Sequence, residues 1–190
     1  MKLIQLSKED DLWRFESIGV SDEVEQEFDA IWDDYQRSGD SNLTKLSLQF
    51  HLERFPNNVD ALHHLSIVYY DLDQHLKAYI CSQAAVSLCL QGIPQEFNWD
   101  TAQIGYELSN RPFFRAYKGL GQRYAQRGMY EQAQQIFKRL ITLNPKDNSG
   151  ARYELIDVYD KQGNQELINQ LVKQYPNEDL LANYAVRFKR

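Results

Sequence analysis

The sequence has little of what membrane and secreted proteins need. No run of apolar residues approaches the roughly 18 that a transmembrane helix requires. The apolar stretch from Leu3 to Leu6 is too short for a signal peptide, and acidic residues follow it at once. Cys81 and Cys89 would lie about 12 Å apart on one helix, which is too far for a disulfide. These absences predict a cytoplasmic protein with reduced, buried thiols.

Catalytic and metal-binding signatures are also missing. The sequence contains no His-Glu-x-x-His, Gly-x-Ser-x-Gly or glycine-rich phosphate-binding motif. His63 and His64 are adjacent, so on a helix their side chains point about 100° apart and do not form a chelating pair. We expect His51 to be partly buried and hydrogen-bonded rather than catalytic. The sequence therefore predicts a protein that is not an enzyme and that uses no cofactor or metal.

The charge is spread unevenly along the chain. The net charge of −6 divides into −8 for residues 1–60, −4 for residues 61–110 and +6 for residues 111–190. An acidic balance argues against nucleic-acid binding, which needs a basic field. The basic C-terminal part suits an acidic partner, or the acidic N-terminal part of a second copy in a head-to-tail oligomer, although symmetric dimers are commoner.

The strongest positive signal is a repeated pattern of about 34 residues. Its clearest copy places aromatic, small and proline residues at fixed spacing, at Tyr117, Leu120, Gly121, Tyr124, Ala133, Phe137 and Pro145. Gly121 and Ala133 would let two helices approach closely, and Pro145 would end the second helix. Gly128 would form the turn between them. The pattern predicts a helical hairpin.

This pattern resembles the tetratricopeptide-repeat (TPR) family, and looser copies extend the resemblance over about residues 25–188. The resemblance implies an all-α fold, a right-handed α-solenoid of about four helical hairpins in a single domain over residues 1–190. The hairpins are expected at residues 25–58, 59–91, 114–147 and 148–176, with a capping helix at residues 178–188.

Residues 92–112 interrupt this array between its second and third hairpins. A structureless loop of that length is uncommon in a compact domain, and this one carries Phe97 and Trp99. We expect the insert to be ordered and to cover apolar surface of the repeats. The alternative is that it lies over the concave groove, where Phe97 and Trp99 would contact a partner.

The resemblance also implies where a partner would bind, because the first helix of each TPR hairpin lines a concave groove. The side chains that would face the groove are Asp29, Asp33, His63, Ile67, Tyr70, Arg111, Arg115, Lys118, Gln122, Tyr153 and Asp157. The cluster of Arg111, Arg115 and Lys118 predicts a pocket for a carboxylate or an acidic segment of the partner.

The predicted function is therefore that of a protein-interaction module or adaptor, which holds a peptide or helix of another protein. Clamping of a chaperone's C-terminal carboxylate is not expected, because Tyr153 and Asp157 stand where that role needs amide and basic side chains. The alternatives are a secretion-type or assembly chaperone and a self-associating structural subunit. No nucleic-acid or membrane partner is expected.

Overall fold

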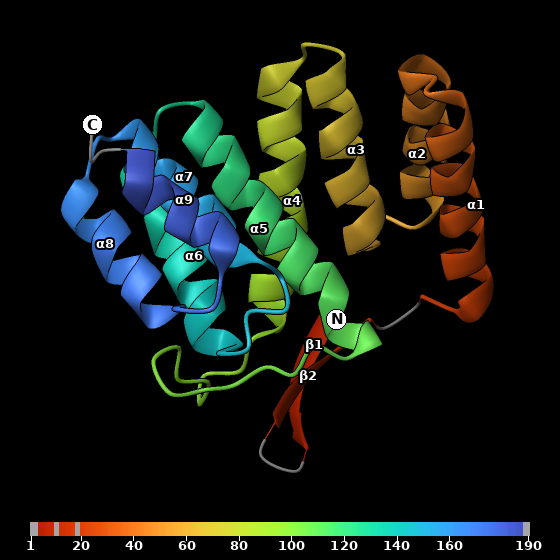
Figure 1. Cartoon of the computed structure of the whole chain (residues 1–190). Coiled ribbons are helices and arrows are strands. Elements are labelled where there is room, and N and C mark those ends of the chain that lie inside the picture. The colour runs from red at the N-terminus through yellow and green to blue at the C-terminus, as the bar shows by residue number, and fades with distance from the viewer. Residues whose placement is uncertain (1–3, 10–11, 18–19, 188–190) are drawn as a thin grey trace.

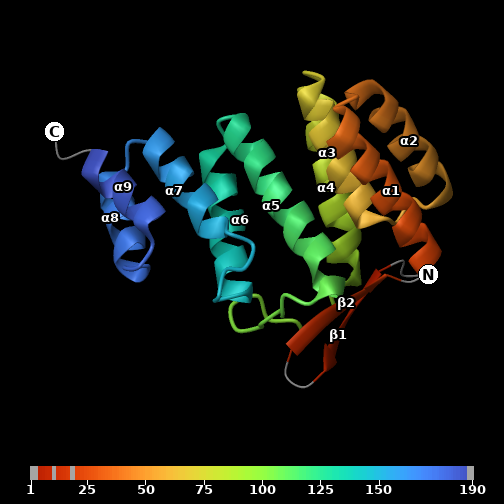
Figure 2. The ribbon, with the colours of Figure 1, turned by 45° about the vertical axis from the view of Figure 1, so that its right-hand side comes forward.

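The computed structural model describes residues 4–9, 12–17 and 20–187, and its helices follow one another as antiparallel pairs (Figures 1 and 2). The helices are α1 (Asp22–Ser38), α2 (Ser41–Arg54), α3 (Val59–Asp71), α4 (His75–Gly92), α5 (Arg111–Gln126), α6 (Tyr130–Leu143), α7 (Ala151–Lys161), α8 (Gln165–Gln174) and α9 (Asp179–Arg187). The predicted helical-repeat fold is confirmed. Phe188, the last residue of the predicted capping helix, lies outside the described residues.

Tight turns join the two helices of each pair. Gly39, Gly128 and Gly163 have φ angles of 66°, 74° and 65°, the left-handed region that glycine enters without a steric penalty. Asp73 takes the same role between α3 and α4, with φ of 57°. Aspartate is one of the few other residues that tolerate this conformation, which explains why the second turn lacks a glycine.

The apolar side chains of the array form two cores. The larger core runs from α4 to α9 and contains the fully buried rings of Phe113, Phe114 and Phe137. The smaller core joins α1, α2 and α3 around Phe28 and Leu48. Each helix pair thus buries its apolar face against its neighbours, as expected of a repeat that cannot form a core alone.

His51 and the two cysteines lie inside this packing. His51 is fully buried, with Nδ1 2.9 Å from Glu27 Oε1 and Nε2 3.0 Å from the amide of Asn58, so the expected hydrogen-bonded histidine is confirmed. Burial raises the pKa of Cys81 to about 11 and that of Cys89 to about 12, so both are protonated thiols at neutral pH. No helix of the described residues is long and apolar enough to cross a membrane.

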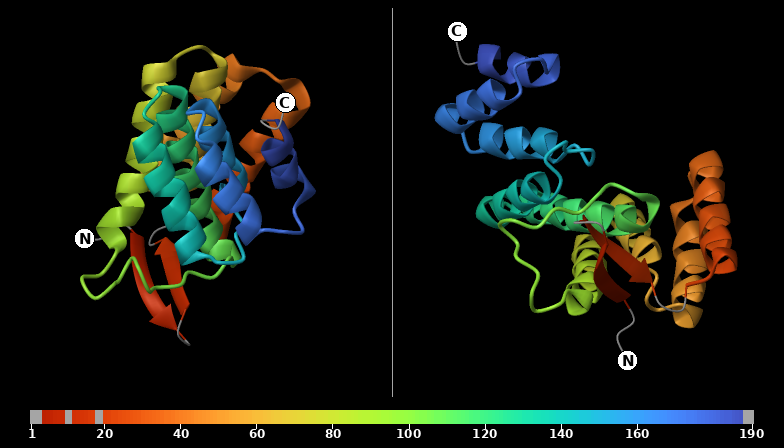
Figure 3. Two further views of the ribbon diagram at one scale, coloured as in Figure 1. Left: turned by 60° about the vertical axis from the view of Figure 1, so that its left-hand side comes forward. Right: turned by 90° about the horizontal axis from the view of Figure 1, so that it is seen from below.

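A β-hairpin precedes the helices, and the all-α prediction missed it. Strands β1 (Ile4–Glu9) and β2 (Leu12–Ser17) pair in antiparallel fashion, and they lie beneath the array (Figure 3). Ile4, Leu6, Trp13 and Phe15 all point into the larger core. An isolated two-stranded hairpin is marginal in water, so contacts with the array stabilise this one.

The insert after α4 is ordered and covers the larger core, as predicted. The backbone N–H of Ile104 donates to the carbonyl of Leu143 at 2.8 Å. The backbone N–H of Trp13 donates to the carbonyl of Gln103 at 3.1 Å. Phe97 is only 6% exposed, so its expected role as a partner contact is wrong: the ring packs edge-on against Trp13. Trp99 is half-buried, and the guanidinium of Arg139 covers it.

Candidate functional site

The expected basic pocket around Arg115 does not form, because an acidic neighbour already neutralises this arginine. Its Nε donates to Asp60 Oδ1 at 2.9 Å, and its Nη2 donates to Asp60 Oδ2 at 2.5 Å. Such a two-pronged pair between α3 and α5 is the strongest geometry that arginine offers. Asp60, near the start of α3, is an ordinary first-turn acid in sequence, so nothing there indicated the pairing.

Other predicted groove residues connect neighbouring helices of the array. Lys118 Nζ donates to the carbonyl of Ser149 at 2.9 Å, which ties α5 to the segment before α7. Gln122 Nε2 donates to Glu154 Oε1 at 2.7 Å. Lys118 therefore has a structural partner, and the prediction that it binds an acidic ligand is not supported.

The predicted groove residues of α7 are engaged in the same way. The hydroxyl of Tyr153 donates to Glu178 Oε2 at 2.5 Å, and the hydroxyl of Tyr184 donates to Asp157 Oδ1. Both contacts hold α9, or the turn before it, against α7. These side chains stabilise the end of the array.

His63 is buried and does not line an open groove, which corrects its predicted role. Its ring lies against Gly119, where a Cβ atom would come within 2.7 Å of the imidazole. Burial lowers the pKa of His63 to well below its usual range, with smaller contributions from His64 and nearby basic residues, so the ring is neutral. Ile67 and Tyr70, farther along α3, are half-buried and keep part of their surface exposed.

An open cleft lies instead where α1, α3 and α5 begin. Its volume is about 330 Å³, and we call it the α1–α3–α5 cleft. The N-terminal ends of these three helices lie toward the same lower side of the molecule in Figure 1. The cleft is lined by Val20, Glu25, Phe28, Asp29, Asn58, Val59, Asp60, Leu108, Arg111, Pro112 and Arg115. Of the predicted groove residues, it therefore brings together Asp29, Arg111 and Arg115.

The cleft combines crowded carboxylates with an apolar wall. Among the described residues, neither Glu25 nor Asp29 forms an ion pair, whereas Asp60 is held by Arg115. Burial raises the pKa of Glu25, and the nearby acids, Asp29 among them, raise it further. Leu108, in the short 3-10 helix η1 (Leu108–Asn110), is 76% exposed, more than any other large apolar side chain of the described residues. A cation with an adjacent apolar group would fit these surroundings.

A second pocket lies at the other end of α3 and α5. Its volume is about 260 Å³, and it is lined by Tyr70, His75, Arg123, Gln126 and Arg127. Arg123 and Arg127 were not predicted, because the TPR resemblance assigns groove roles to other positions of α5 and places Arg127 in the turn after it. Within the described ranges, no three His, Cys, Asp or Glu side chains gather closely enough to hold a metal ion.

Comparison with known proteins supports the fold. No protein-family model matches the chain, and no curated protein does. Among solved structures, the MamA protein is 21% identical, with a TM-score of 0.58, and the match covers 87% of this chain and 80% of that one.

Two further structures match with similar scores. A tetratricopeptide repeat protein from Parabacteroides merdae is 19% identical over 80% of this chain and 52% of its own, with a TM-score of 0.57. The Cut9-Hcn1 structure is 18% identical over 82% of this chain but only 28% of its own, with a TM-score of 0.59. The chain has the tetratricopeptide-repeat fold.

Proposed function

We propose that this chain is a protein-interaction adaptor that binds a short segment of another protein in the α1–α3–α5 cleft. The observation that carries the proposal is the exposed Leu108 beside the unpaired carboxylates of Glu25 and Asp29. Leu108 shares the cleft with Phe28, Val59 and Pro112, and an apolar surface rimmed by polar groups is typical of a binding site.

The charges of the cleft define the chemistry of the segment. A lysine or arginine beside Glu25 and Asp29 would relieve the repulsion that, together with burial, raises the pKa of Glu25. An apolar side chain next to that cation would cover Leu108. The three carboxylates of the cleft, those of Glu25, Asp29 and Asp60, outnumber the guanidinium groups of Arg111 and Arg115. We therefore propose a basic and apolar segment, the opposite of the acidic one that the sequence suggested.

The size of the cleft favours a few side chains rather than a whole domain surface. A volume of about 330 Å³ lies at the small end of ligand pockets. A peptide, or one face of a helix, can place two or three anchoring side chains there. The fold supports this use, since the Cut9-Hcn1 structure is a hetero-tetramer.

Charge reversal in the cleft tests the proposal. Peptides selected from a random display library against the wild-type chain are expected to carry lysine or arginine next to an apolar residue. The Glu25→Lys/Asp29→Lys variant should lose about tenfold or more in affinity for them, because it replaces attraction by repulsion. Fluorescence anisotropy with a labelled peptide measures the loss.

The matched control is Glu23→Lys/Glu53→Lys, which makes the same change of charge at two exposed acids outside the cleft. It should keep most of the affinity, and thermal melts should show both variants folded. An equal loss in the two variants would mean that only the overall charge matters, and selection of acidic peptides would refute the proposed chemistry.

Self-association is a second candidate function, and α2 provides the observation that favours it. Leu43, Leu46 and Phe50 are all exposed on this helix. Their spacing of three and four residues places them on one face, so they form an apolar stripe. A second copy could cover the stripe, with the polarised charge of the chain aiding the contact.

A further inference from the structure

Arg123 is a buried arginine without a carboxylate partner. Only 6% of its surface is exposed, and its guanidinium stacks 4.3 Å from the ring centroid of Tyr70. Nη1 donates to Gln126 Oε1 at 2.7 Å, while Nε is buried and has no hydrogen-bond partner among the described residues. Buried charges are normally paired, so this side chain lacks an anion.

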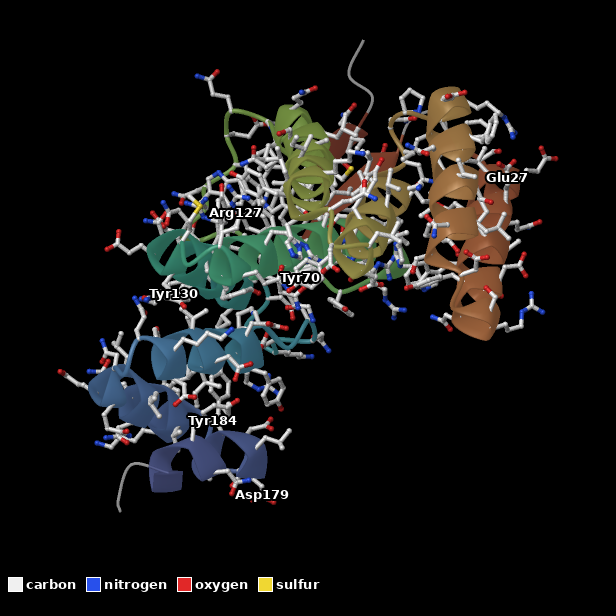
Figure 4. All side chains as sticks on the ribbon, turned by 90° about the horizontal axis from the view of Figure 1, so that it is seen from above. Glu27, Tyr70, Arg127, Tyr130, Asp179 and Tyr184 are labelled. Carbon is white, nitrogen blue, oxygen red and sulfur yellow. The ribbon has the colours of Figure 1, made fainter. Side chains whose placement is uncertain are left out.

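Arg127 and His75 line the same pocket. Arg127 stacks with its guanidinium 4.8 Å from the ring centroid of Tyr79, and it is exposed. His75, the first residue of α4, packs its ring 4.8 Å from that of Tyr70. Figure 4 shows Tyr70 and Arg127 on this upper face of the molecule. The pocket, which we call the Arg123 pocket, measures about 260 Å³.

The acids near the Arg123 pocket do not neutralise it. Asp71 accepts a hydrogen bond from the hydroxyl of Tyr35 at 2.6 Å. Asp73 is almost fully exposed, and its carboxylate lies 3.8 Å from His75 Nε2. In the described part of the chain, neither acid comes within ion-pair distance of Arg123 or Arg127. Burial lowers the pKa of Arg123, and Tyr70 and Asp71 oppose this shift only in part.

We infer that the Arg123 pocket binds an oxyanion, the phosphate or carboxylate group of a ligand. The guanidinium carbons of Arg123 and Arg127 lie over the rings of Tyr70 and Tyr79, and these contacts restrain both side chains while leaving N–H groups to donate. That planar fork matches the oxygens of phosphate and carboxylate groups. Gln126 can add its amide N–H after a rotation. Arg123 and Gln126 lie on the last turn of α5 and Arg127 follows it directly, so one segment supplies most of the donors.

This inference goes beyond the proposed function and does not depend on it. The Arg123 pocket lies eight residues along α5 from Arg115 in the α1–α3–α5 cleft, which is about 12 Å of helical rise. The cleft favours a cation and the pocket an anion. Loss of peptide binding at the cleft would therefore leave oxyanion binding intact, and each proposal can fail alone.

The test follows backbone amide resonances by NMR while sodium phosphate is added to the ¹⁵N-labelled chain, with ionic strength held constant by sodium chloride. Saturable shifts are expected at Tyr70, His75 and Arg127. A parallel titration with sodium acetate distinguishes the two sources of the oxyanion. A stronger response to phosphate assigns the site to a phosphate group, and a stronger response to acetate assigns it to a carboxylate.

Two variants and a matched control make the test specific. Arg127→Gln should weaken phosphate binding at least fivefold, and Arg123→Gln should abolish it. Arg123 is buried, so Arg123→Gln could fail to fold. Arg127 is exposed, so Arg127→Gln tests the pocket independently of that outcome. Arg139→Gln is the control, since Arg139 is also exposed and stacks 4.6 Å from the Trp99 ring, outside the pocket. No saturable shift, or wild-type affinity in Arg127→Gln, would overturn the inference.

Discussion

Replacement of Gly121 by leucine is expected to lower the free energy of unfolding by about 3 kcal/mol. A Cβ atom at Gly121 would lie 2.5 Å from Phe137 Cε1 and 3.0 Å from Ile136 Cγ2, both on the facing helix α6. Phe137 is fully buried, so its ring cannot turn aside into solvent without disturbing its neighbours. The leucine would therefore force α5 and α6 apart, where a glycine lets them touch.

Urea denaturation followed by circular dichroism measures this loss. The matched control is Gln135→Leu, which adds a leucine at an exposed position of α6 and should change stability by no more than about 0.5 kcal/mol. If Gly121→Leu were as stable as this control, the close packing of α5 on α6 would be wrong.

Replacement of Asn110 by alanine is expected to cost about 3 kcal/mol, because one side chain holds the β-hairpin to the array. Asn110 is fully buried, and its Oδ1 accepts from the backbone N–H of Phe15 at 2.7 Å. Its Nδ2 donates to the carbonyls of Trp13 at 3.1 Å and Gly105 at 2.9 Å. Alanine leaves buried backbone groups of β2 and the insert without partners.

With Trp32 and Trp99 replaced by phenylalanine, Trp13 provides the readout, because its ring is buried beside Phe97 and its fluorescence should shift to the red when the hairpin detaches. Ser109→Ala changes an exposed neighbour and serves as the control. Wild-type emission and stability in Asn110→Ala would show that the hairpin is held by its apolar contacts alone.

The helical array could be predicted because local rules determine it. Gly121 and Ala133 are small where helices cross, and Gly128 and Gly163 stand at turns that need positive φ. Even Asp73, which departs from glycine, is a residue that tolerates such a turn. Each of these constraints acts within about one repeat, so the residue types that satisfy it recur at a fixed spacing in the sequence.

The β-hairpin escaped prediction because its cause is not local. Ile4 and Leu6 alternate with polar residues, as do Trp13 and Phe15, but so short an alternation is weak evidence. The hairpin depends on close contact with α4: a Cβ atom at Gly92 would lie 2.4 Å from the carbonyl oxygen of Ile4. Nothing in the N-terminal segment itself reveals that a glycine far along the chain makes room for it.

The predicted groove residues were also affected by contacts that are distant in the sequence. Resemblance placed Arg115 and Lys118 near the expected face, yet their partners are Asp60 and Ser149, 55 and 31 residues away. Whether a basic side chain is available to a ligand depends on such distant pairs, which helical periodicity does not report. This is why the sequence could predict the fold but not which charged side chains remain available to a partner.

Site-specific photo-crosslinking in the native cell tests the adaptor role most directly. A photoreactive amino acid in place of Leu108 lies at the wall of the α1–α3–α5 cleft, and one in place of Leu46 lies on the apolar stripe of α2. We expect the crosslinker at position 108 to form an adduct with a basic and apolar segment of a different protein. The Glu25→Lys/Asp29→Lys variant should lose this adduct. An adduct at Leu46 alone, or only between two copies of this chain, would contradict it and favour self-association.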